Sequence, residues 1–326
     1  PTVNGTAGTV NTGGGGGAGG VGPTPSPSGT SAAGGSGLVI VKELDKASGV
    51  WSMQSQFQNR QAGTWPYISF IEATGGNATV TCGSYKTHIF TDSGPFNVSG
   101  LALLPANDVV DYLVVAGGGG GAGSDNNVKG GGGGAGGFRM SNSFSLPGPT
   151  TSPLANPSSL PVSVQDYTIT VGGGGVGAPV AGGANCNVGT VGGNSTFSTI
   201  TSTGGGYGGS YSNDGAVAGG SGGGGGTWGS GPGNKCGAAG DTPATPIAQG
   251  FPGGDSVNYG PPFTNQSAGG GGGAAAAGTD WTSPGALTPG GAGSYIADTF
   301  VGPTAPSYGS PGPIGSTRYF AGGGGG

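Results

Sequence analysis

The side chains that could carry acid–base or nucleophilic chemistry are few and widely spaced in this sequence. The chain has one histidine, His88, and 13 acidic residues. His88 lies in the alternating stretch KTHIF, which is typical of a strand, so we expect it to be a structural strand residue. Glu72 has no carboxylate neighbour in the sequence, which leaves a paired acid–base site unsupported. We therefore predict that the protein is not an enzyme, uses no cofactor and holds no metal ion.

The three cysteines allow at most one disulfide. Cys82 ends a strand-like run, and we expect it to be a buried thiol. Cys186 and Cys236 both lie in glycine-rich loops and are the candidate disulfide pair. Because the sequence sets no distance between them, their pairing stays open.

Aromatic residues in the loops are the candidates for binding. Exposed loop aromatics stack on sugars or anchor a protein receptor. The alternative is that they cap the ends of glycine-rich structure and shield it. The loops at 241–265 and 279–317 are the strongest candidates, and the binding residues that we expect are Trp228, Phe251, Tyr259, Phe263, Trp281 and Tyr308.

Composition excludes several classes of protein. Of 326 residues, 86 are glycine and 25 are proline, while 6% are charged and the net charge is −5. A chain this poor in basic residues has no patch for nucleic acid. No apolar run is long enough to cross a membrane, so we expect no membrane insertion.

The elements that would position these residues begin with a β-rich stretch. We predict strands at 38–43, 68–73, 78–82, 86–91, 96–98 and 109–115, with a tight hairpin at Gly83-Ser84. Val50, Met53 and Phe57 recur at helical spacing, which predicts a short amphipathic helix over 50–61.

Glycine runs then recur, several of them led in by a short strand-like stretch, as where YTITV runs into residues 172–175, and aromatic-containing loops separate them. Extended polyproline-type threads leave every N–H and C=O in need of a partner, and close packing of threads tolerates only glycine inside. The predicted fold is mostly irregular plus β, with bundles of polyglycine II helices joined by a small β-rich connector with one short helix. The predicted scaffold glycines are Gly119, Gly132, Gly173, Gly205, Gly224 and Gly271.

The phrases VDYLVVAGGGGGAG, YTITVGGGGVG and GGSGLVIVKE resemble the glycine-rich modules of bacteriophage tail-fibre and tail-tip proteins, including the receptor-binding adhesins of T-even-type phages. KASGVWSMQSQFQNRQAGTWP is similar to the connector that follows such modules. The resemblance implies four parts: the closing part of a module (1–43), a connector with the short helix (44–76), a β-strand entry segment (77–116) and a polyglycine II bundle with exposed loops (117–326). In that order the closing phrase precedes the opening phrase. We therefore expect a segment of a longer protein, or a head-to-tail assembly in which residues 322–326 pack beside the 13–20 run of the next subunit.

The resemblance implies a structural, adhesive component of a phage tail fibre or tail tip, in the virion or extracellular. Its partners would be a bacterial surface receptor, either an outer-membrane protein or a glycan, and other copies or other tail proteins. The alternative is a self-assembling extracellular glycine-rich filament or matrix protein. An ice-binding protein is disfavoured because long aromatic loops break the strict Gly-x-x period that a flat binding face needs, and a carbohydrate-active enzyme fused to an adhesin lacks an acid pair.

Overall fold

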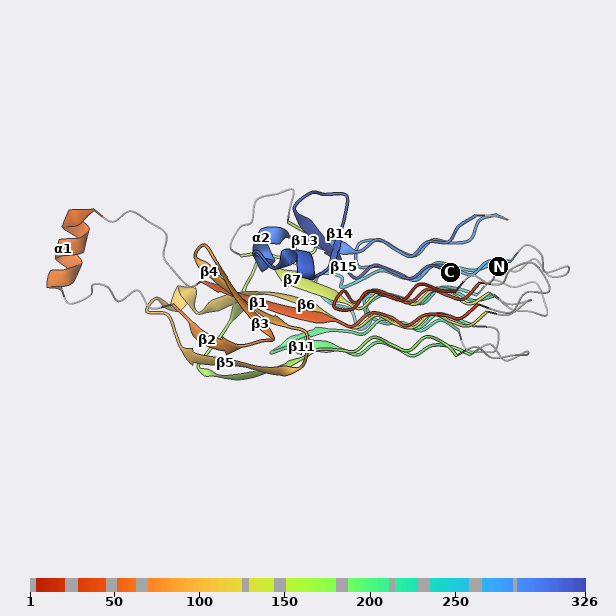
Figure 1. The fold of residues 1–326 in the computed structure, drawn as a ribbon, viewed down its shortest axis with the longest axis horizontal. Helices are drawn as coiled ribbons and strands as arrows, with labels where there is room; N and C mark the ends of the chain where they lie inside the picture. The colour runs from red at the N-terminus through yellow and green to blue at the C-terminus, as the bar shows by residue number, and fades with distance from the viewer. Residues whose placement is uncertain are drawn as a thin grey trace.

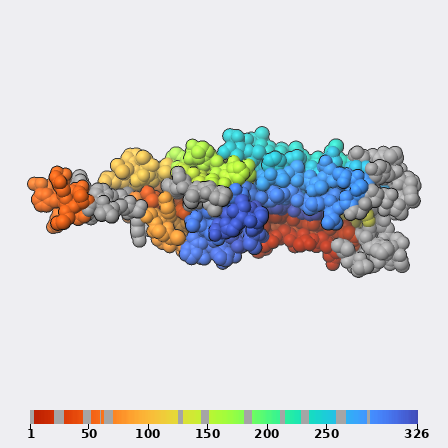
Figure 2. All heavy atoms as spheres, turned by 90° about the horizontal axis from the view of Figure 1, so that it is seen from above, coloured from red at the N-terminus to blue at the C-terminus, as the bar shows by residue number. Residues whose placement is uncertain are grey.

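The computed structural model shows an elongated molecule with β-sheets toward one end and glycine-rich segments running away from them (Figure 1). It describes residues 4–20, 29–44, 52–62, 70–124, 129–143, 151–179, 187–210, 215–227, 235–257, 266–283 and 286–326. The space-filling view shows the same elongated shape from a second side (Figure 2).

The described strands form three sheets, of which the largest has seven strands in the order β3-β4-β1-β6-β7-β8, with β9 paired to β6. Every pairing in it is antiparallel except the short parallel pair of β7 with β8. Its strands are β1 (Leu38–Leu44), β3 (Ala78–Cys82), β4 (Tyr85–Phe90), β6 (Val109–Val115), β7 (Phe138–Ser141), β8 (Ala155–Asn156) and β9 (Leu160–Pro161).

The two smaller sheets lie against the large one. The five-stranded sheet has the order β12-β11-β10-β5-β2, and the three-stranded sheet has the order β13-β15-β14. Their strands are β2 (Glu72–Gly75), β5 (Gly94–Gly100), β10 (Gln165–Thr170), β11 (Ser195–Phe197), β12 (Ile200–Ser202), β13 (Ser294–Ala297), β14 (Ser310–Pro311) and β15 (Thr317–Phe320). The helices are α1 (Met53–Gln61) and α2 (Asp298–Val301), with 3-10 turns η1 (Pro105–Asn107) and η2 (Ala305–Ser307).

The central strands of the large sheet, β1 and β6, are buried on both faces. Along β1, Leu38 and Ile40 pack into one apolar cluster with Phe300 and Phe320 of the C-terminal part. Val39 and Val41 point the opposite way, into a second cluster that holds residues of the five-stranded sheet, including Phe96, Tyr167, Ile169 and Phe197. This arrangement explains why β1 reads as a continuous apolar run rather than an alternating one.

The strands predicted at 38–43, 78–82, 86–91, 96–98 and 109–115 are confirmed as β1, β3, β4, β5 and β6. The strand predicted at 68–73 overlaps β2 only at Glu72 and Ala73, and residues 68 and 69 lie outside the described residues. The hairpin is also confirmed, because β3 pairs with β4 in antiparallel register and Gly83 takes the positive φ of 62° that the tight turn needs. The prediction that Cys82 is buried is wrong, since Cys82 is an exposed free cysteine on the outermost strand of the sheet.

The predicted helix is confirmed, but its apolar face is not buried. α1 begins after Ser52, whose Oγ accepts a hydrogen bond from the Ser55 amide at 3.1 Å. Met53 is 86% exposed and Phe57 is 68% exposed. The helix lies apart from the sheets (Figure 1), so no described element covers these two side chains.

Between the strands run glycine segments, by which we mean the described glycine-rich stretches with neither helix nor strand: 4–9, 14–19, 29–37, 116–124, 129–137, 171–179, 187–194, 203–210, 215–227, 235–240, 250–256, 268–283, 286–293 and 321–326. They are joined sideways by backbone hydrogen bonds, as where Gly16 N donates to Gly119 O at 2.9 Å and Gly119 N donates to Gly134 O at 2.8 Å. A Cβ on Gly119 would overlap the carbonyl oxygen of Gly206 in a neighbouring segment. The close approach of these backbones therefore requires glycine at such positions.

The predicted fold class is wrong. The described residues form a β-rich protein with several sheets and only two short helices, and they show no polyglycine II bundles. Only the expectation of irregular plus β structure fits in part. The physical reason is that the β-branched and aromatic residues that flank the later glycine runs complete the sheets. β10 pairs with β5, and β7 pairs with β6, so the β part is not a small connector.

The predicted packing of the chain ends on a neighbouring subunit is also corrected. Gly15 N donates to Gly322 O at 2.9 Å and Ala18 N donates to Gly325 O at 3.1 Å, all within one chain. The N-terminal and C-terminal glycine segments therefore lie side by side in the same molecule, as Figure 2 shows for the red and blue parts. This contact occurs because β1 and β15, which follow and precede these segments, contribute to the same apolar cluster.

Candidate functional site

The glycine segments place one set of residues at the end of the molecule away from the sheets. Segment 250–256 starts beside the large sheet, where Phe138 N donates to Gln249 O at 2.9 Å. It leads outward to Val257, which forms an isolated bridge with Ser267 on the returning segment. The ends of the other segments gather at the same place (Figure 1). We call this region the far end.

The structure brings few of the predicted binding aromatics to an exposed position. Trp228, Tyr259 and Phe263 lie outside the described residues. Trp281 is only 4% exposed, so the expectation of an exposed side chain is wrong for it. Its position fits the alternative that such aromatics shield the glycine segments.

The other two predicted aromatics are half-buried. Phe251 lies within a glycine segment, where its amide donates to Gly273 O at 3.0 Å. Tyr308 packs against the apolar cluster beside the three-stranded sheet. Neither lies at the far end, because the first follows Gln249 closely and the second sits at the sheets.

The first part of the predicted 241–265 binding loop is tied down near the sheets. The Asp241 carboxylate accepts hydrogen bonds from Thr245 Oγ1 at 2.7 Å and from the amides of Thr245 and Gln249. Burial raises the pKa of Asp241, but these hydrogen bonds outweigh it, and the pKa is lowered overall. Gln249, itself fully buried, accepts from Thr203 N at 2.8 Å. This stretch is therefore a pinned turn rather than a free loop.

Two carboxylates near the far end are sites that the sequence reasoning missed. Asp255 N donates to Asp280 Oδ1 at 2.8 Å, and Gly237 N donates to Asp255 Oδ1 at 2.8 Å. Both side chains are exposed. Among the described residues the second oxygen of each carboxylate accepts no hydrogen bond, so each can receive one from a ligand hydroxyl or amide. In the sequence, each aspartate directly follows a short glycine-containing stretch, Gly253-Gly254 before Asp255 and Gly278-Thr279 before Asp280. The sequence does not show that these two stretches are neighbours.

A buried group of charged residues lies on β1 and β4. Glu43 Oε1 contacts Lys86 Nζ at 2.8 Å and His88 Nε2 at 3.3 Å. His88 Nδ1 lies 2.8 Å from Gly75 O. His88 is 1% exposed and Glu43 is fully buried, while the Lys86 side chain is 21% exposed. These residues link the paired strands β1 and β4. The placement of His88 on a strand is confirmed.

Lys42 occupies the other face of β1. Its Nζ donates to Thr299 O at 2.9 Å and lies 4.6 Å from the centre of the Tyr85 ring. Burial lowers the pKa of Lys42 from 10.5 to about 8, and the nearby Cys82 and Asp111 oppose that shift. Burial likewise raises the pKa of Tyr112.

The predicted scaffold glycines lie in the glycine segments, but they are not equivalent. A Cβ would overlap a backbone carbonyl at Gly119, Gly132, Gly205, Gly224 and Gly271. At Gly173 a Cβ would meet no heavy atom within 4 Å. Gly173 is therefore on an outer edge, and its position does not require a glycine.

The candidate disulfide stays untested. Cys236 is exposed and free, and Cys186 lies outside the described residues.

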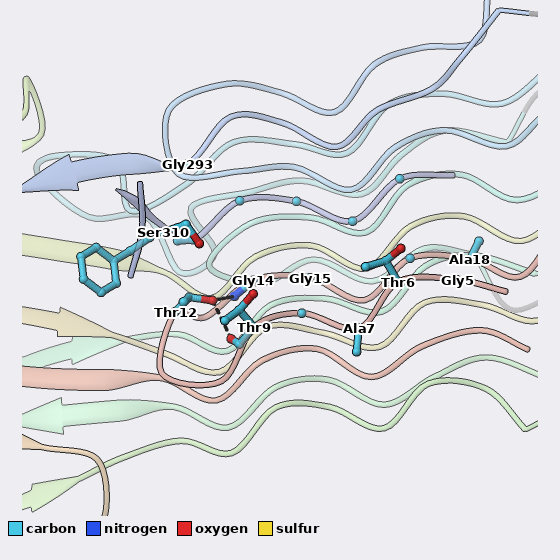
Figure 3. A pocket seen from close by; sticks show the side chains of 18 of the residues that line it. Gly5, Thr6, Ala7, Thr9, Thr12, Gly14, Gly15, Ala18, Gly293 and Ser310 are labelled. Carbon is cyan, nitrogen blue, oxygen red and sulfur yellow. Dashed lines mark hydrogen bonds between the residues drawn. The ribbon is translucent and has the colours of Figure 1, made fainter. Parts of the chain in front are cut away.

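An open groove of about 460 Å³ runs beside the N-terminal segment. Its lining includes residues 4–9, residues 14, 15, 17 and 18, and residues 319–326, with Ser310 and Gly293 at the end nearer the sheets (Figure 3). No lining residue carries a charged side chain. We call this feature the N/C groove, because glycine segments from both parts of the chain form it.

A model of the glycine-rich domain matches residues 91–326 of the chain, well over half of its length. The chain belongs to this family of glycine-rich domains. Comparisons with curated proteins and with solved structures found no match. The matched region begins at residue 91, directly after β4. It includes every described glycine segment from residue 116 onward. Among the described residues, no helix has the length and apolar character needed to cross a membrane.

Proposed function

We propose that this glycine-rich domain is a structural, adhesive component of a phage tail fibre or tail tip, which attaches the virion to a bacterial surface through side chains at the far end. The observation that carries the proposal is the elongated frame of glycine segments. Their sideways backbone hydrogen bonds hold the described ends of these segments together at one end of the molecule. A rigid frame lowers the ordering cost when those residues bind a receptor.

The receptor that fits this end is an outer-membrane protein or a glycan. Asp255 and Asp280 offer exposed carboxylate oxygens, which accept hydrogen bonds from sugar hydroxyls. The residues that link the outgoing and returning segments in sequence include Trp228, Tyr259 and Phe263, whose rings supply apolar contact.

The experiment compares retention of fluorescently labelled protein on a panel of cultured Gram-negative bacteria. In the test variant, residues 258–265 are replaced by eight glycine and serine residues. In the control variant, Leu103 and Leu104, which are 58% and 60% exposed at the opposite part of the molecule, are replaced by serine. We expect the test variant to lose at least tenfold in retention on the strain that binds the wild type. Equal retention of the test variant, or no binding strain, contradicts the proposal.

The second candidate function is a self-assembling extracellular filament or matrix protein. The N/C groove favours it, because an open groove between glycine segments offers a place for another copy. A filament that forms from the purified chain alone, with no retention on cells, would favour this candidate over the adhesive one.

A further inference from the structure

Several backbone amides and carbonyl oxygens along the N/C groove have no hydrogen-bond partner among the described residues, and they determine what the groove can bind. The amides of Gly322 and Gly325 donate no hydrogen bond within the described chain, although both residues line the groove. On the adjacent segment, which is hydrogen-bonded to residues 322 and 325, the carbonyl oxygens of Gly15 and Ala18 accept none from the described residues. In each segment the two unpaired groups are three residues apart, which is a spacing of roughly 10 Å along an extended chain.

The lining excludes most other kinds of ligand. Because no charged side chain lines the groove, no side chain there forms an ion pair with a ligand. What it offers is a row of backbone donors on one side and backbone acceptors on the other. An extended polypeptide satisfies both rows at once, in the way that an exposed sheet edge is completed by an added strand.

The open side of the groove has room for such a segment. A Cβ on Gly322 would be 3.9 Å from its nearest heavy atom, and one on Gly325 would be 3.7 Å away. Between them in the sequence, a Cβ on Gly324 would overlap Gly16 O. The two glycines with room for a side chain, Gly322 and Gly325, are therefore three residues apart, and Gly324 between them packs inward.

The chain itself carries a segment with the matching pattern. The outer segment 172–178 exposes Gly173 and Gly174, and its Val176 is 65% exposed. At Gly174 and at Gly177, neither the amide nor the carbonyl oxygen has a hydrogen-bond partner among the described residues. These two glycines are also three residues apart. The segment thus presents donors and acceptors at the spacing that the groove requires.

We propose that the N/C groove of one copy binds segment 172–178 of a second copy of this chain. The groove and the segment are different surfaces, so the contact is heterologous and repeats from copy to copy. Such a contact gives a ring where the rotation closes and an open filament where it does not. The proposal does not rest on the adhesive function, since it concerns how copies join and not what the far end binds.

The test uses the full chain and three variants that add a side chain where the structure has room. Gly322→Leu with Gly325→Leu fills the groove, and Gly173→Leu adds bulk to the outer segment. Gly215→Leu is the matched control, because a Cβ there also meets no heavy atom within 4 Å and Gly215 is absent from the groove lining. Sedimentation velocity over a concentration series reports the size of the assembly.

We expect the wild type and Gly215→Leu to form larger species as their concentration rises, while the groove variant and the segment variant each stay monomeric. A mixture of the two blocked variants is expected to give a dimer and nothing larger, because only one groove and one segment remain intact between them. A wild type that stays monomeric at its highest soluble concentration overturns the proposal. Association of either blocked variant alone, or a mixture that stays monomeric, also overturns it.

Hydrogen–deuterium exchange on the wild type tests the same contact without any substitution, so it applies even if a variant fails to fold. The amides of Gly322, Gly325, Gly174 and Gly177 are expected to exchange more slowly at high protein concentration than at low concentration. Association without added protection at these amides would show that copies join elsewhere, and would contradict the proposal.

Discussion

Two glycines in the same kind of segment place opposite demands on their residue type. A Cβ on Gly224 would overlap Gly269 O, whereas a Cβ on Gly173 would meet open space. Gly224 also donates to Gly132 O at 2.8 Å, so it cannot move away without losing a backbone hydrogen bond. At the residue scale, the glycine content is therefore required by close approach of backbones at some positions and not at others.

This difference predicts opposite effects of the same substitution. We expect Gly224→Ala to lower the free energy of unfolding by about 3 kcal/mol, since it overpacks a site bounded by backbone. Gly173→Ala should be neutral or raise it by about 0.5 kcal/mol, because alanine restricts the unfolded chain. Urea denaturation of both variants beside the wild type measures this. Equal losses at the two sites would show that tight backbone packing does not decide where glycine is needed.

Lys42 predicts a dependence of stability on pH. Its pKa is about 8 when folded, against 10.5 in the unfolded chain. Between these values the unfolded state binds the proton and the folded state does not, so stability rises with pH from about 8 toward 10.5. The full rise is about 3 kcal/mol. We expect Lys42→Met to be more stable than the wild type at pH 7 and to lack this rise. A wild type whose melting temperature is flat or falling between pH 8 and pH 10 would contradict the assignment.

At the scale of elements, the sequence was informative where strands are long. β1, β4 and β6 have six or seven residues each and are rich in β-branched and aromatic side chains, and this local pattern locates them. β8 and β9 have two residues each. β8 pairs with β7, and β9 pairs with β6, from which two glycine segments separate it in the sequence. No local pattern predicts such pairings, because the glycine segments between the strands decide which edges meet.

The candidate sites show the same limit. The burial of Trp281 and the exposure of Cys82 follow from which segments become neighbours, and composition does not reveal that. The N/C groove is likewise visible only when residues 14–18 and 321–326 are known to be adjacent. The three-residue spacing of its open glycines is present in the sequence, but a run of five glycines does not show which of them faces outward.

The pinned turn at Asp241 gives a prediction at the element scale. Asp241→Ala removes a carboxylate that accepts hydrogen bonds from Thr245 and Gln249, and it leaves buried donors in this turn without their partner. We expect a loss of about 2 kcal/mol in the free energy of unfolding, with retention on bacterial cells unchanged because the turn lies near the sheets. Asp255→Ala is the matched comparison, because it removes a carboxylate of the far end, and it should reduce retention with a smaller loss of stability. If Asp241→Ala reduced retention and Asp255→Ala did not, the binding region would lie near the sheets. That result would contradict the proposal that the far end binds the receptor.

At the scale of the whole molecule, stability and presentation are separated in space. Three sheets enclose the two apolar clusters toward one end, and the glycine segments extend from them to the far end (Figure 1). This arrangement allows the residues at the far end to change without disturbing the core. It also leaves the sides of the glycine segments, where the N/C groove lies, available for contact with another copy.

We propose that this glycine-rich domain belongs to the attachment end of a phage particle. Immunogold electron microscopy on material from the native source, with an antibody raised against the purified chain, tests it most directly. We expect gold at the tips of phage tails or tail fibres. Gold along continuous fibres that lack phage heads would contradict the phage assignment and support the self-assembling filament.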